Sequence, residues 1–424
     1  MSILMMFVVL LFVILIGMPI AFALLLSSTA FVALQGTDPV MLVAQRFFVS
    51  NDSFPLMAIP FFMLAGEIMS ESGVSRRLVN VASVCVGWIT GGLVMVVTLT
   101  GMFFAAMSGS SAACTAATGS ILIPAMKEKG YKPEFTAAAV AAAGVVGIVI
   151  PPSITMVVFG VATQTSVTQL FTAGIIPGII MGLSMMVVNY FLSKKHGYVG
   201  EPLKSAKETW AILKEGIWAL MTPVIILGGI YRGIFTATES AVVAVVYVLI
   251  VGFFVYRELE IKKLPTIMLK TITGSAVVLI IMNAAGLFGW ILTANQVPQK
   301  VAIAIAEYTT NRYLIITLVN LMLLVVGCFI NASPAVIMLA PIITPVLVGL
   351  GYDPVFIGVL IVINLSIGCI TPPVGVDLFV AQSISGVSIG RITVAILPLM
   401  GILLLDLIIF TFFPQIILFL PSLM

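Results

Sequence analysis

Two proline pairs interrupt long apolar stretches of this chain at positions 221 residues apart. Pro151-Pro152 lies inside residues 135–160, which would otherwise form one apolar helix, and Pro372-Pro373 repeats the interruption. Proline has no backbone N–H, so the carbonyl four residues before it in a helix has no partner. An unpaired carbonyl in a membrane is costly because no water is there to bind it. Each break therefore requires a new partner, which can be protein, water or a cation.

The 221-residue offset extends well beyond the proline pairs. Nine residues of the first half, Pro124, Gly130, Tyr131, Pro133, Phe135, Gly147, Pro151, Pro152 and Pro177, recur as Pro345, Gly351, Tyr352, Pro354, Phe356, Gly368, Pro372, Pro373 and Pro398. One proline pair alone could equally be a plain kink. Two pairs in register, each preceded by glycine at the same spacing, predict duplicated broken helices. Paired breaks of this kind point to the binding site of a transporter.

Composition places this repeat in a membrane. The chain is 61% hydrophobic and 8% charged, with a mean hydropathy of +1.25, so we predict an all-α polytopic membrane protein. The few basic residues are scattered, which indicates no nucleic acid partner. His196 is expected to be a solvated side chain in a loop. Four cysteines lie in apolar runs without a CxxC pair and predict neither a disulfide nor a zinc site: Cys85, Cys114, Cys328 and Cys369.

Two segments are predicted to be re-entrant helical hairpins. Residues 91–126 are apolar except for the centre Met107-Ser-Gly-Ser-Ser-Ala112, which is too polar and too rich in glycine for one spanning helix. Their counterpart is residues 312–348, with a tip at Asn331-Ala-Ser-Pro334. Each hairpin precedes one of the two broken transmembrane helices, which we place at about 135–165 and 355–386.

Further apolar runs predict helices at 3–16, 18–35, 54–70, 173–193, 217–235, 237–256, 271–293 and 391–413. The first should remain as a membrane anchor, because no basic segment or cleavage site accompanies it. Residues 38–52 and 194–216 are polar enough to be interfacial, and in the second Leu203, Ala206, Trp210 and Leu213 recur at helical spacing. We divide the chain into scaffold helices (1–52), a first transport half (53–193), a cytoplasmic linker (194–216), further scaffold helices (217–270) and a second transport half (271–424).

The distribution of basic residues predicts the orientation. Fifteen lysines and arginines fall in or next to five segments and only four elsewhere: 71–77, 127–134, 194–216, 257–270 and 387–391. By the positive-inside rule these five segments are cytoplasmic. The basic loop 127–134 is then inside, whereas its equivalent, residues 348–354, carries no base and lies outside. The two repeats are therefore predicted to be inverted, with both termini outside.

The hairpin tips and the helix breaks should meet near the middle of the membrane, around a cavity. The tips supply hydroxyl and amide oxygens, and the breaks are expected to leave the carbonyls of Gly147, Ile148, Gly368 and Cys369 free. Neutral oxygens without clustered carboxylates suit a monovalent cation. Half-helix N-termini at the same place favour an anionic substrate. For the small residues 108–117, close helix packing is the alternative interpretation.

Four stretches together resemble the large membrane subunit of tripartite ATP-independent periplasmic (TRAP) transporters, over almost the whole chain: Ile59-Pro-Phe-Phe-Met-Leu-Ala-Gly-Glu67, Ser108-Gly-Ser-Ser-Ala112, Gly147 to Ser153, and Thr371-Pro-Pro-Val-Gly375. The resemblance implies sodium-driven uptake of organic acids across the bacterial inner membrane. It also implies a periplasmic substrate-binding protein, a small four-helix membrane subunit, and a transport domain that moves against a scaffold like an elevator. We expect the small subunit to be a separate chain, and both termini to be periplasmic.

The same resemblance implies at least two sodium sites. The first would comprise Ser108, Ser110, Gly147, Ile150 and Pro152, and the second Asn331, Ser333, Gly368, Thr371 and Pro373. For the substrate we expect contacts from Ser110, Ser111, Ser153, Thr155, Asn331 and Asp377. Asp377 departs from the family pattern, in which asparagine is more usual, and an intramembrane carboxylate is a functional candidate that either binds substrate hydroxyls or pairs with a neighbouring polar group. Glu67, Glu239 and Asp406 are weaker candidates, expected near helix ends or subunit contacts.

Other functional classes fit the sequence less well. A channel would need a continuous pore lined by rings of charge or carbonyls, which the sequence does not indicate. An intramembrane enzyme would need paired carboxylates, a histidine cluster or a nucleophile with its base, and the chain has one histidine and isolated acids. The alternative that stays open is a stand-alone sodium/dicarboxylate symporter of the same broad architecture. A sialic acid, a sugar acid or a four-carbon dicarboxylate would each fit as substrate.

Overall fold

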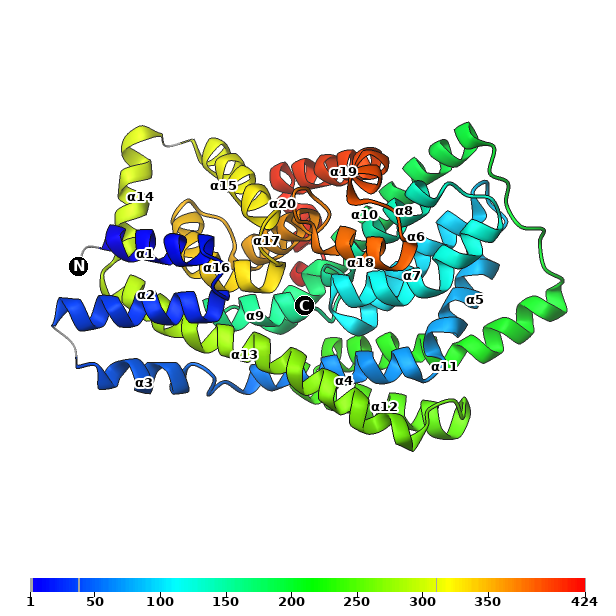
Figure 1. Ribbon diagram of the computed structural model, residues 1–424, viewed down its shortest axis with the longest axis horizontal. Coiled ribbons are helices and arrows are strands. Elements are labelled where there is room, and N and C mark those ends of the chain that lie inside the picture. The colour runs from blue at the N-terminus through cyan, green and yellow to red at the C-terminus, as the bar shows by residue number, and fades with distance from the viewer. Residues whose placement is uncertain (1–2, 37–38, 310, 424) are drawn as a thin grey trace.

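The computed structural model describes residues 3–36, 39–309 and 311–423, and within these ranges every regular element is a helix (Figure 1). The first half contains α1 (Ile3–Leu15), α2 (Ile20–Gln35), α3 (Met41–Val49), α4 (Ala58–Glu71), α5 (Val74–Val86), α6 (Gly92–Ser108), α7 (Ser111–Glu128), α8 (Pro133–Val145), α9 (Ile154–Thr163) and α10 (Val167–His196). The second half contains α11 (Ala206–Tyr231), α12 (Ala237–Ile250), α13 (Leu264–Ala294), α14 (Val297–Tyr308), α15 (Arg312–Gly327), α16 (Ala332–Gly349), α17 (Pro354–Gly368), α18 (Val376–Ser385), α19 (Ile389–Phe412) and α20 (Pro414–Leu418).

The helices have the composition and length of a polytopic membrane protein. Among the described residues, seven helices are long and apolar enough to cross a membrane. Many large apolar side chains face outward, including Phe12, Phe191 and Val394, and such a surface requires lipid or a partner around it. By contrast, α9 and α18 have only 10 residues each, about 15 Å of helix and half of a bilayer core.

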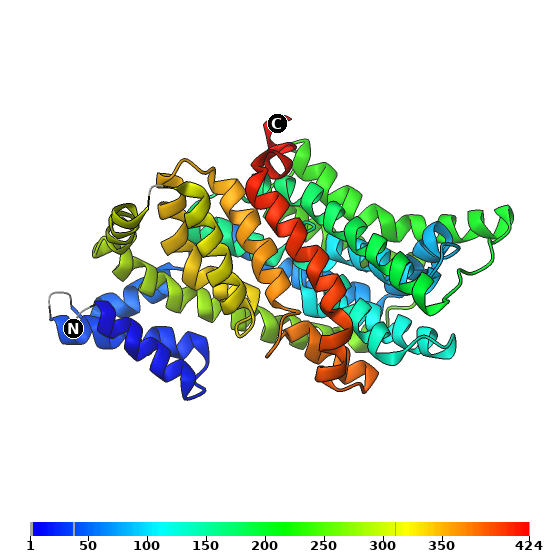
Figure 2. The same cartoon turned by 90° about the horizontal axis from the view of Figure 1, so that it is seen from above.

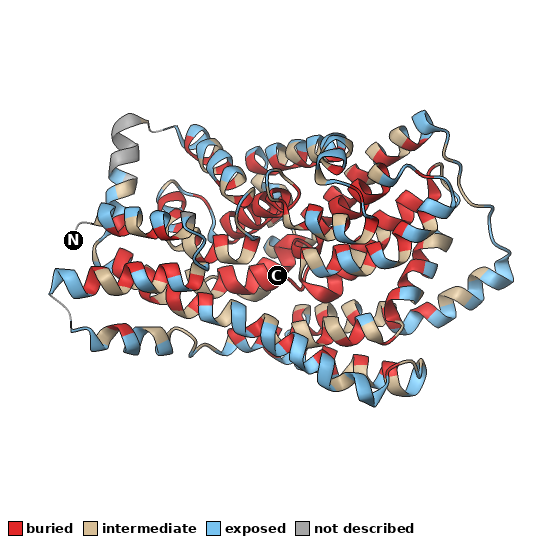
Figure 3. Cartoon of the chain, in the orientation of Figure 1, coloured by how far each residue is buried: buried red, intermediate tan, exposed pale blue. Residues whose placement is uncertain are grey.

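The 221-residue repeat is also a repeat of packing. Helix α7 packs against α18, and the equivalent helix α16 packs against α9; likewise α8 packs against α19, and α17 against α10. Each half thus contributes its hairpin to the broken helix of the other half (Figure 2). The equivalent helices α8 and α17 are buried along almost their whole length (Figure 3). The core of the molecule therefore lies at the junction of the two repeats.

The structure corrects the predicted linker at 194–216. Helix α10 continues to His196, whose ring stacks on Phe135 and Tyr198, so this histidine does not lie in a loop. Helix α11 runs without interruption from Ala206 to Tyr231, since Ser205 and Glu208 form a capping box at its start and the apolar sequence continues past residue 216. The linker is therefore not a separate helix. The other predicted boundary, at residue 270, also falls inside a helix, α13.

Helices α5 and α14 were not predicted from the sequence. Helix α4 was predicted, and it has neighbours on two sides. Helix α4 packs against α12 and α13, and also against α6 of the first hairpin. Where α4 meets α6, a Cβ placed on Gly66 would lie 3.5 Å from Cα of Ser108, which is an ordinary contact distance. Helix α4 therefore lies between the predicted scaffold and the tip of the first hairpin.

Candidate functional site

The tip of the first hairpin turns through Gly109, between α6 and α7. Gly109 has φ +62°, a left-handed conformation that glycine adopts without a steric penalty. The next residue, Ser110, caps α7: its hydroxyl accepts a hydrogen bond from the Ala113 N–H at 3.4 Å. The Ser108 hydroxyl donates to the Ser110 carbonyl at 3.4 Å. The sequence Ser-Gly-Ser therefore ends one helix and starts the next with its polar atoms gathered at the turn.

The first break is closed by a serine. Between the end of α8 and the start of α9, the Pro151–Pro152 peptide bond is cis. The Ser153 hydroxyl donates to the Ile148 carbonyl at 2.6 Å and accepts from the Met156 N–H at 3.2 Å. The expectation of a free carbonyl at Ile148 is therefore wrong, because the cap of α9 reaches back to it.

The second break resembles the first in its cis Pro372–Pro373 bond but uses backbone donors. The Thr371 N–H donates to the Gly368 carbonyl at 3.0 Å, and the Asp377 N–H donates to the Cys369 carbonyl at 3.0 Å. The expectation of free carbonyls at Gly368 and Cys369 is also wrong: the Gly368 carbonyl is bonded by a turn just before the prolines, and the Cys369 carbonyl by the start of α18 after them. A carbonyl oxygen has two lone pairs, so each retains one for a further partner.

The first hairpin tip lies against the first break. A Cβ placed on Gly147 would lie 3.0 Å from the Ser110 carbonyl oxygen, and one on Gly109 would lie 2.8 Å from the Pro152 carbonyl oxygen. The structure thus brings together four members of the expected first sodium set: Ser108, Ser110, Gly147 and Pro152. The side chain of the fifth, Ile150, points toward Gly178 of α10.

The second hairpin meets the second break in a related way. A Cβ on Gly368 would lie 2.5 Å from Cα of Gly327, at the end of α15, and the Val374 N–H donates to the Cys328 carbonyl at 3.3 Å. At the tip, the Asn331 side chain caps α16 through the Ala332 N–H at 2.7 Å. Gly368, a member of the expected second sodium set, therefore lies against the end of α15. The hydroxyl of Thr371, another member, donates to the Ile367 carbonyl at 2.8 Å.

The two halves meet at a pair of hydroxyls. The Ser333 hydroxyl at the second tip lies 3.1 Å from the Thr155 hydroxyl in the first turn of α9. This contact joins the second hairpin to the first broken helix. Thr155 belongs to α9 and Ser333 to α16, so the hydroxyl contact lies within the packing of these two helices.

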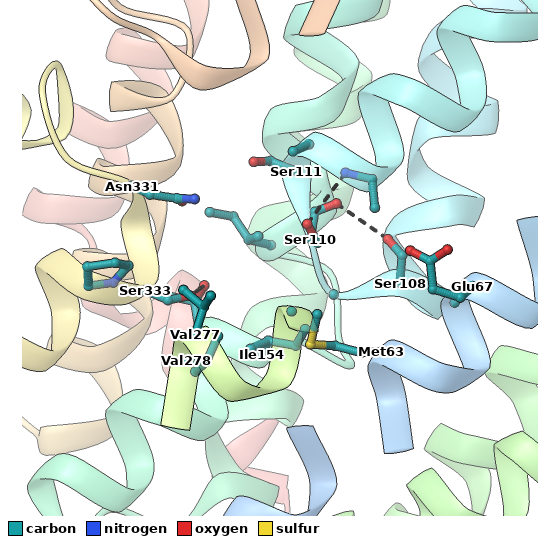
Figure 4. Close-up of a pocket in the computed structure, with 18 of the residues that line it drawn as sticks. Met63, Glu67, Ser108, Ser110, Ser111, Ile154, Val277, Val278, Asn331 and Ser333 are labelled. Carbon is teal, nitrogen blue, oxygen red and sulfur yellow. Dashed lines mark hydrogen bonds between the residues drawn. The ribbon is translucent and has the colours of Figure 1, made fainter. Parts of the chain in front are cut away.

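A cavity of about 370 Å³ lies between the two hairpin tips, with α4 and α13 as its other walls (Figure 4). Its polar lining includes Ser108, Ser110, Ser111, Thr155, Asn331 and Ser333. Figure 4 shows Ser110 and Ser111 on one wall and Asn331 and Ser333 on the opposite one. Four of the six residues expected at the substrate site therefore share one cavity: Ser110, Ser111, Thr155 and Asn331.

The other two, Ser153 and Asp377, do not line the cavity, and the Ser153 hydroxyl is bonded at the first break. The Asp377 side chain is fully buried, and neither of its carboxylate oxygens has a hydrogen-bond partner among the described residues. Asp406 is also buried and accepts a hydrogen bond from Ser184 at 2.5 Å. Glu239 completes the capping box at the start of α12 with Thr236. Glu67 lines the cavity, which its position near the end of an apolar helix did not indicate.

Apart from the Glu67 carboxylate, the polar groups that line the cavity are neutral. Within the part of the chain that the structure describes, no three His, Cys, Asp or Glu side chains gather as a metal-binding group. The cavity is lined by hydroxyl groups, one amide and the N-termini of helices. Such groups can bind an alkali cation through their oxygens and an organic anion through their N–H donors.

Comparison with known proteins decides the family. The profile of the family described as "Tripartite ATP-independent periplasmic transporter, DctM component" matches residues 5–416. The chain belongs to this family. Membership agrees with the broken helices and hairpin tips described above, and it places the protein among transporters.

Similar proteins in the family are named for several different substrates. The chain is 45% identical to the isethionate TRAP transporter permease protein DctMQ of Oleidesulfovibrio alaskensis, over 95% of this chain and 63% of that protein. It is 42% identical to the C4-dicarboxylate TRAP transporter large permease protein DctM of Pseudomonas aeruginosa, over 94% of this chain and 93% of that protein. It is 37% identical to the sialic acid TRAP transporter large permease protein SiaM of Vibrio cholerae, over 96% and 95%.

A solved structure shares the fold. The YdaH transporter of Alcanivorax borkumensis superposes with a TM-score of 0.56 over 85% of this chain and 86% of that one, at 15% sequence identity. This similarity concerns the fold alone.

Proposed function

We propose that this chain is the membrane subunit through which an organic acid anion enters a bacterial cell, driven by sodium. The cavity between the hairpin tips carries the proposal, because its polar groups come from both repeats. The substrate would contact Ser110, Ser111, Thr155 and Asn331. Helix N-termini at Ser110, Ser153 and Asn331 supply N–H groups and partial positive charge for an anion.

The relatives' names narrow the class of substrate. Isethionate, C4-dicarboxylates and sialic acids are organic anions with carboxylate or sulfonate groups. A cavity of about 370 Å³ is large enough for any of the three. We therefore infer an organic acid anion as substrate, delivered by a periplasmic binding protein, with a separate small four-helix subunit bound to the apolar outer face.

Sodium coupling is proposed from the oxygen sets at the two tips. Ser108, Ser110, Gly147 and Pro152 present hydroxyl and carbonyl oxygens within one region. The second set would comprise Asn331, Ser333, Gly368, Thr371 and Pro373. Because Ser108, Ser110, Asn331 and Ser333 of these sets also line the cavity, an ion bound at a tip would order the lining that the anion contacts.

For the mechanism we propose an inverted repeat with re-entrant hairpins and an elevator movement. The exchange of hairpins between the repeats binds α6–α10 and α15–α19 into one packed unit. The outer helices α1, α2, α11 and α12, with their exposed apolar faces, would be the scaffold. An inverted repeat supplies two states, since each half can adopt the conformation of its twin.

The proposed orientation has support from the ion pairs. All five ion pairs found among the described residues join segments in or next to those predicted to be cytoplasmic: Arg77–Glu258, Lys129–Glu201, Lys263–Glu71, Lys270–Glu67 and Arg391–Glu134. We expect a single cysteine at Val199, which is 82% exposed, to react with an impermeant reagent only from the cytoplasm. Labelling from the periplasm would overturn the topology.

Reconstitution tests the function. The chain, with its small subunit, would be placed in proteoliposomes, and uptake of labelled succinate, isethionate and N-acetylneuraminate measured with and without matching binding proteins. We expect uptake of one class that requires both its binding protein and sodium. Equal uptake without any binding protein would favour the alternative, a stand-alone sodium/dicarboxylate symporter. Absence of uptake for every organic acid would contradict the proposal.

A further inference from the structure

The cavity wall carries a single ionisable group. Of the described residues that line it, only Glu67 has a charged side chain; the others are apolar, small or neutral polar. The Glu67 carboxylate lies 3.8 Å from Nζ of Lys270 on α13. The two side chains are 32% and 52% exposed, so the pair is solvated and contributes little to stability. Its position suggests an electrostatic role instead.

The crossing of α4 and α13 explains why this pair lies at the cavity. A Cβ on Gly274 would come within 2.3 Å of Cε of Met63, so the two helices touch at these residues. They run antiparallel, and Glu67 is one turn after Met63, whereas Lys270 is one turn before Gly274. Both charges therefore lie on the same side of the crossing, which is the predicted cytoplasmic side.

A second glutamate–lysine pair lies further along α4, and its lysine, Lys263, immediately precedes α13. Glu71 and Lys263 are 2.9 Å apart, and neither lines the cavity. The charges of this pair and the exposure of its side chains match those of the first pair. This second pair provides an internal control that carries the same charges but lies further from the cavity.

We propose that Lys270 sets the electrostatic potential of the cavity by neutralising Glu67, and so allows organic anions to occupy it and leave toward the cytoplasm. The proposal rests on the proposed function in one respect, the negative charge of the substrate. At an effective dielectric constant of about 20, one unit charge about 10 Å away changes the local concentration of a monovalent ion roughly tenfold. For a dianion the factor is roughly a hundredfold, so the pair discriminates by substrate charge.

Charged thiol reagents measure this potential without any substrate. Val277 lines the cavity, is 54% exposed and lies two turns beyond Lys270 on α13. A Val277→Cys reporter would be made in a full-length chain whose four native cysteines are replaced, and held in lipid nanodiscs. Its rates of reaction with anionic sulfonatoethyl and cationic trimethylammonium-ethyl methanethiosulfonates would be measured, and the anion-to-cation rate ratio compared among variants.

Each variant has a defined expectation. Lys270→Gln should lower the ratio roughly tenfold or more, Glu67→Gln should raise it by a similar factor, and the double variant should return it to within about threefold of the parent. Lys263→Gln and Glu71→Gln, further from the cavity and screened by solvent, should change it less than threefold.

Three results would overturn the proposal: an unchanged ratio in Lys270→Gln, an equal change in Lys263→Gln, or a double variant that does not recover. Should Lys270→Gln fail to fold, an unchanged ratio in Glu67→Gln is decisive against it. With a transported anion, Lys270→Gln should also slow uptake and the double variant restore it. A parent chain that transports no organic anion would refute the proposed function but leave the reagent ratios standing.

Discussion

Ser110 has two roles at the tip of the first hairpin, and they can be separated. Its hydroxyl caps α7, and it belongs to the proposed first sodium set. Ser110→Ala should therefore lower stability by about 1 kcal/mol through the lost cap and raise the sodium concentration for half-maximal uptake at least several-fold. Ser110→Thr, which keeps a hydroxyl, should restore both.

The matched control is Ser120→Ala. Ser120 is an exposed residue of the same helix whose hydroxyl bonds only the Ala117 carbonyl. Sodium dependence should stay at the parent value in this variant. An unchanged sodium dependence in Ser110→Ala would remove Ser110 from the site.

The sequence alone predicted the positions of site residues that depend only on their neighbours in the chain. Ser110 and Asn331 follow helix breaks, so their positions at hairpin tips are visible in the chain alone. Glu67 could not be placed at the cavity, because its position depends on the crossing of α4 with α13, more than 200 residues away. The carbonyls of Ile148, Gly368 and Cys369 were wrongly predicted to be free, because their donors are nearby groups whose positions depend on how the chain turns on either side of each proline pair.

At the scale of elements, the contact between the second hairpin and the second broken helix depends on two glycines. A Cβ on Gly368 would lie 2.5 Å from Cα and 2.7 Å from the carbonyl carbon of Gly327. These are backbone atoms of a packed helix and cannot move aside cheaply. Gly368→Ala should lower the free energy of unfolding by about 1–3 kcal/mol, measured as a lower melting temperature of the purified protein.

Gly401 in α19 is the control for this variant, because a Cβ there would have nothing within 4 Å. Gly401→Ala should leave stability unchanged or raise it by about 0.5–1 kcal/mol, since alanine favours the helix. Equal melting temperatures for the two variants would show that the close approach of α15 and α17 is not a constraint.

The ends of helices could be predicted where a proline or glycine marks them, and less well elsewhere. The breaks at Pro151 and Pro372 fall where expected, whereas α11 and α13 run through predicted boundaries at residues 216 and 270. Polar residues near a membrane surface do not by themselves end a helix. A capping group or a chain reversal is needed, and the sequence at those two boundaries has neither.

For the whole molecule, the elevator proposal predicts that distances change between bodies and not within one. Spin labels at exposed Ser120 on α7 and Val224 on α11 should shift by about 5 Å or more when sodium is replaced by choline. Labels at Ser120 and exposed Ser383 on α18, which packs against α7, should keep their distance. Equal behaviour of both pairs in every condition would contradict the elevator and favour a gated pore.

The most direct test of sodium-driven transport is the accumulation ratio at a fixed sodium gradient. Proteoliposomes containing the chain and its small subunit, with binding protein outside, would be held at zero voltage under a tenfold inward sodium gradient. Coupling to two or more ions predicts a steady-state anion gradient of roughly a hundredfold or more, because each ion contributes a factor of ten. Accumulation that stops near tenfold would contradict coupling to two ions, and accumulation unchanged when choline replaces sodium would contradict sodium coupling altogether.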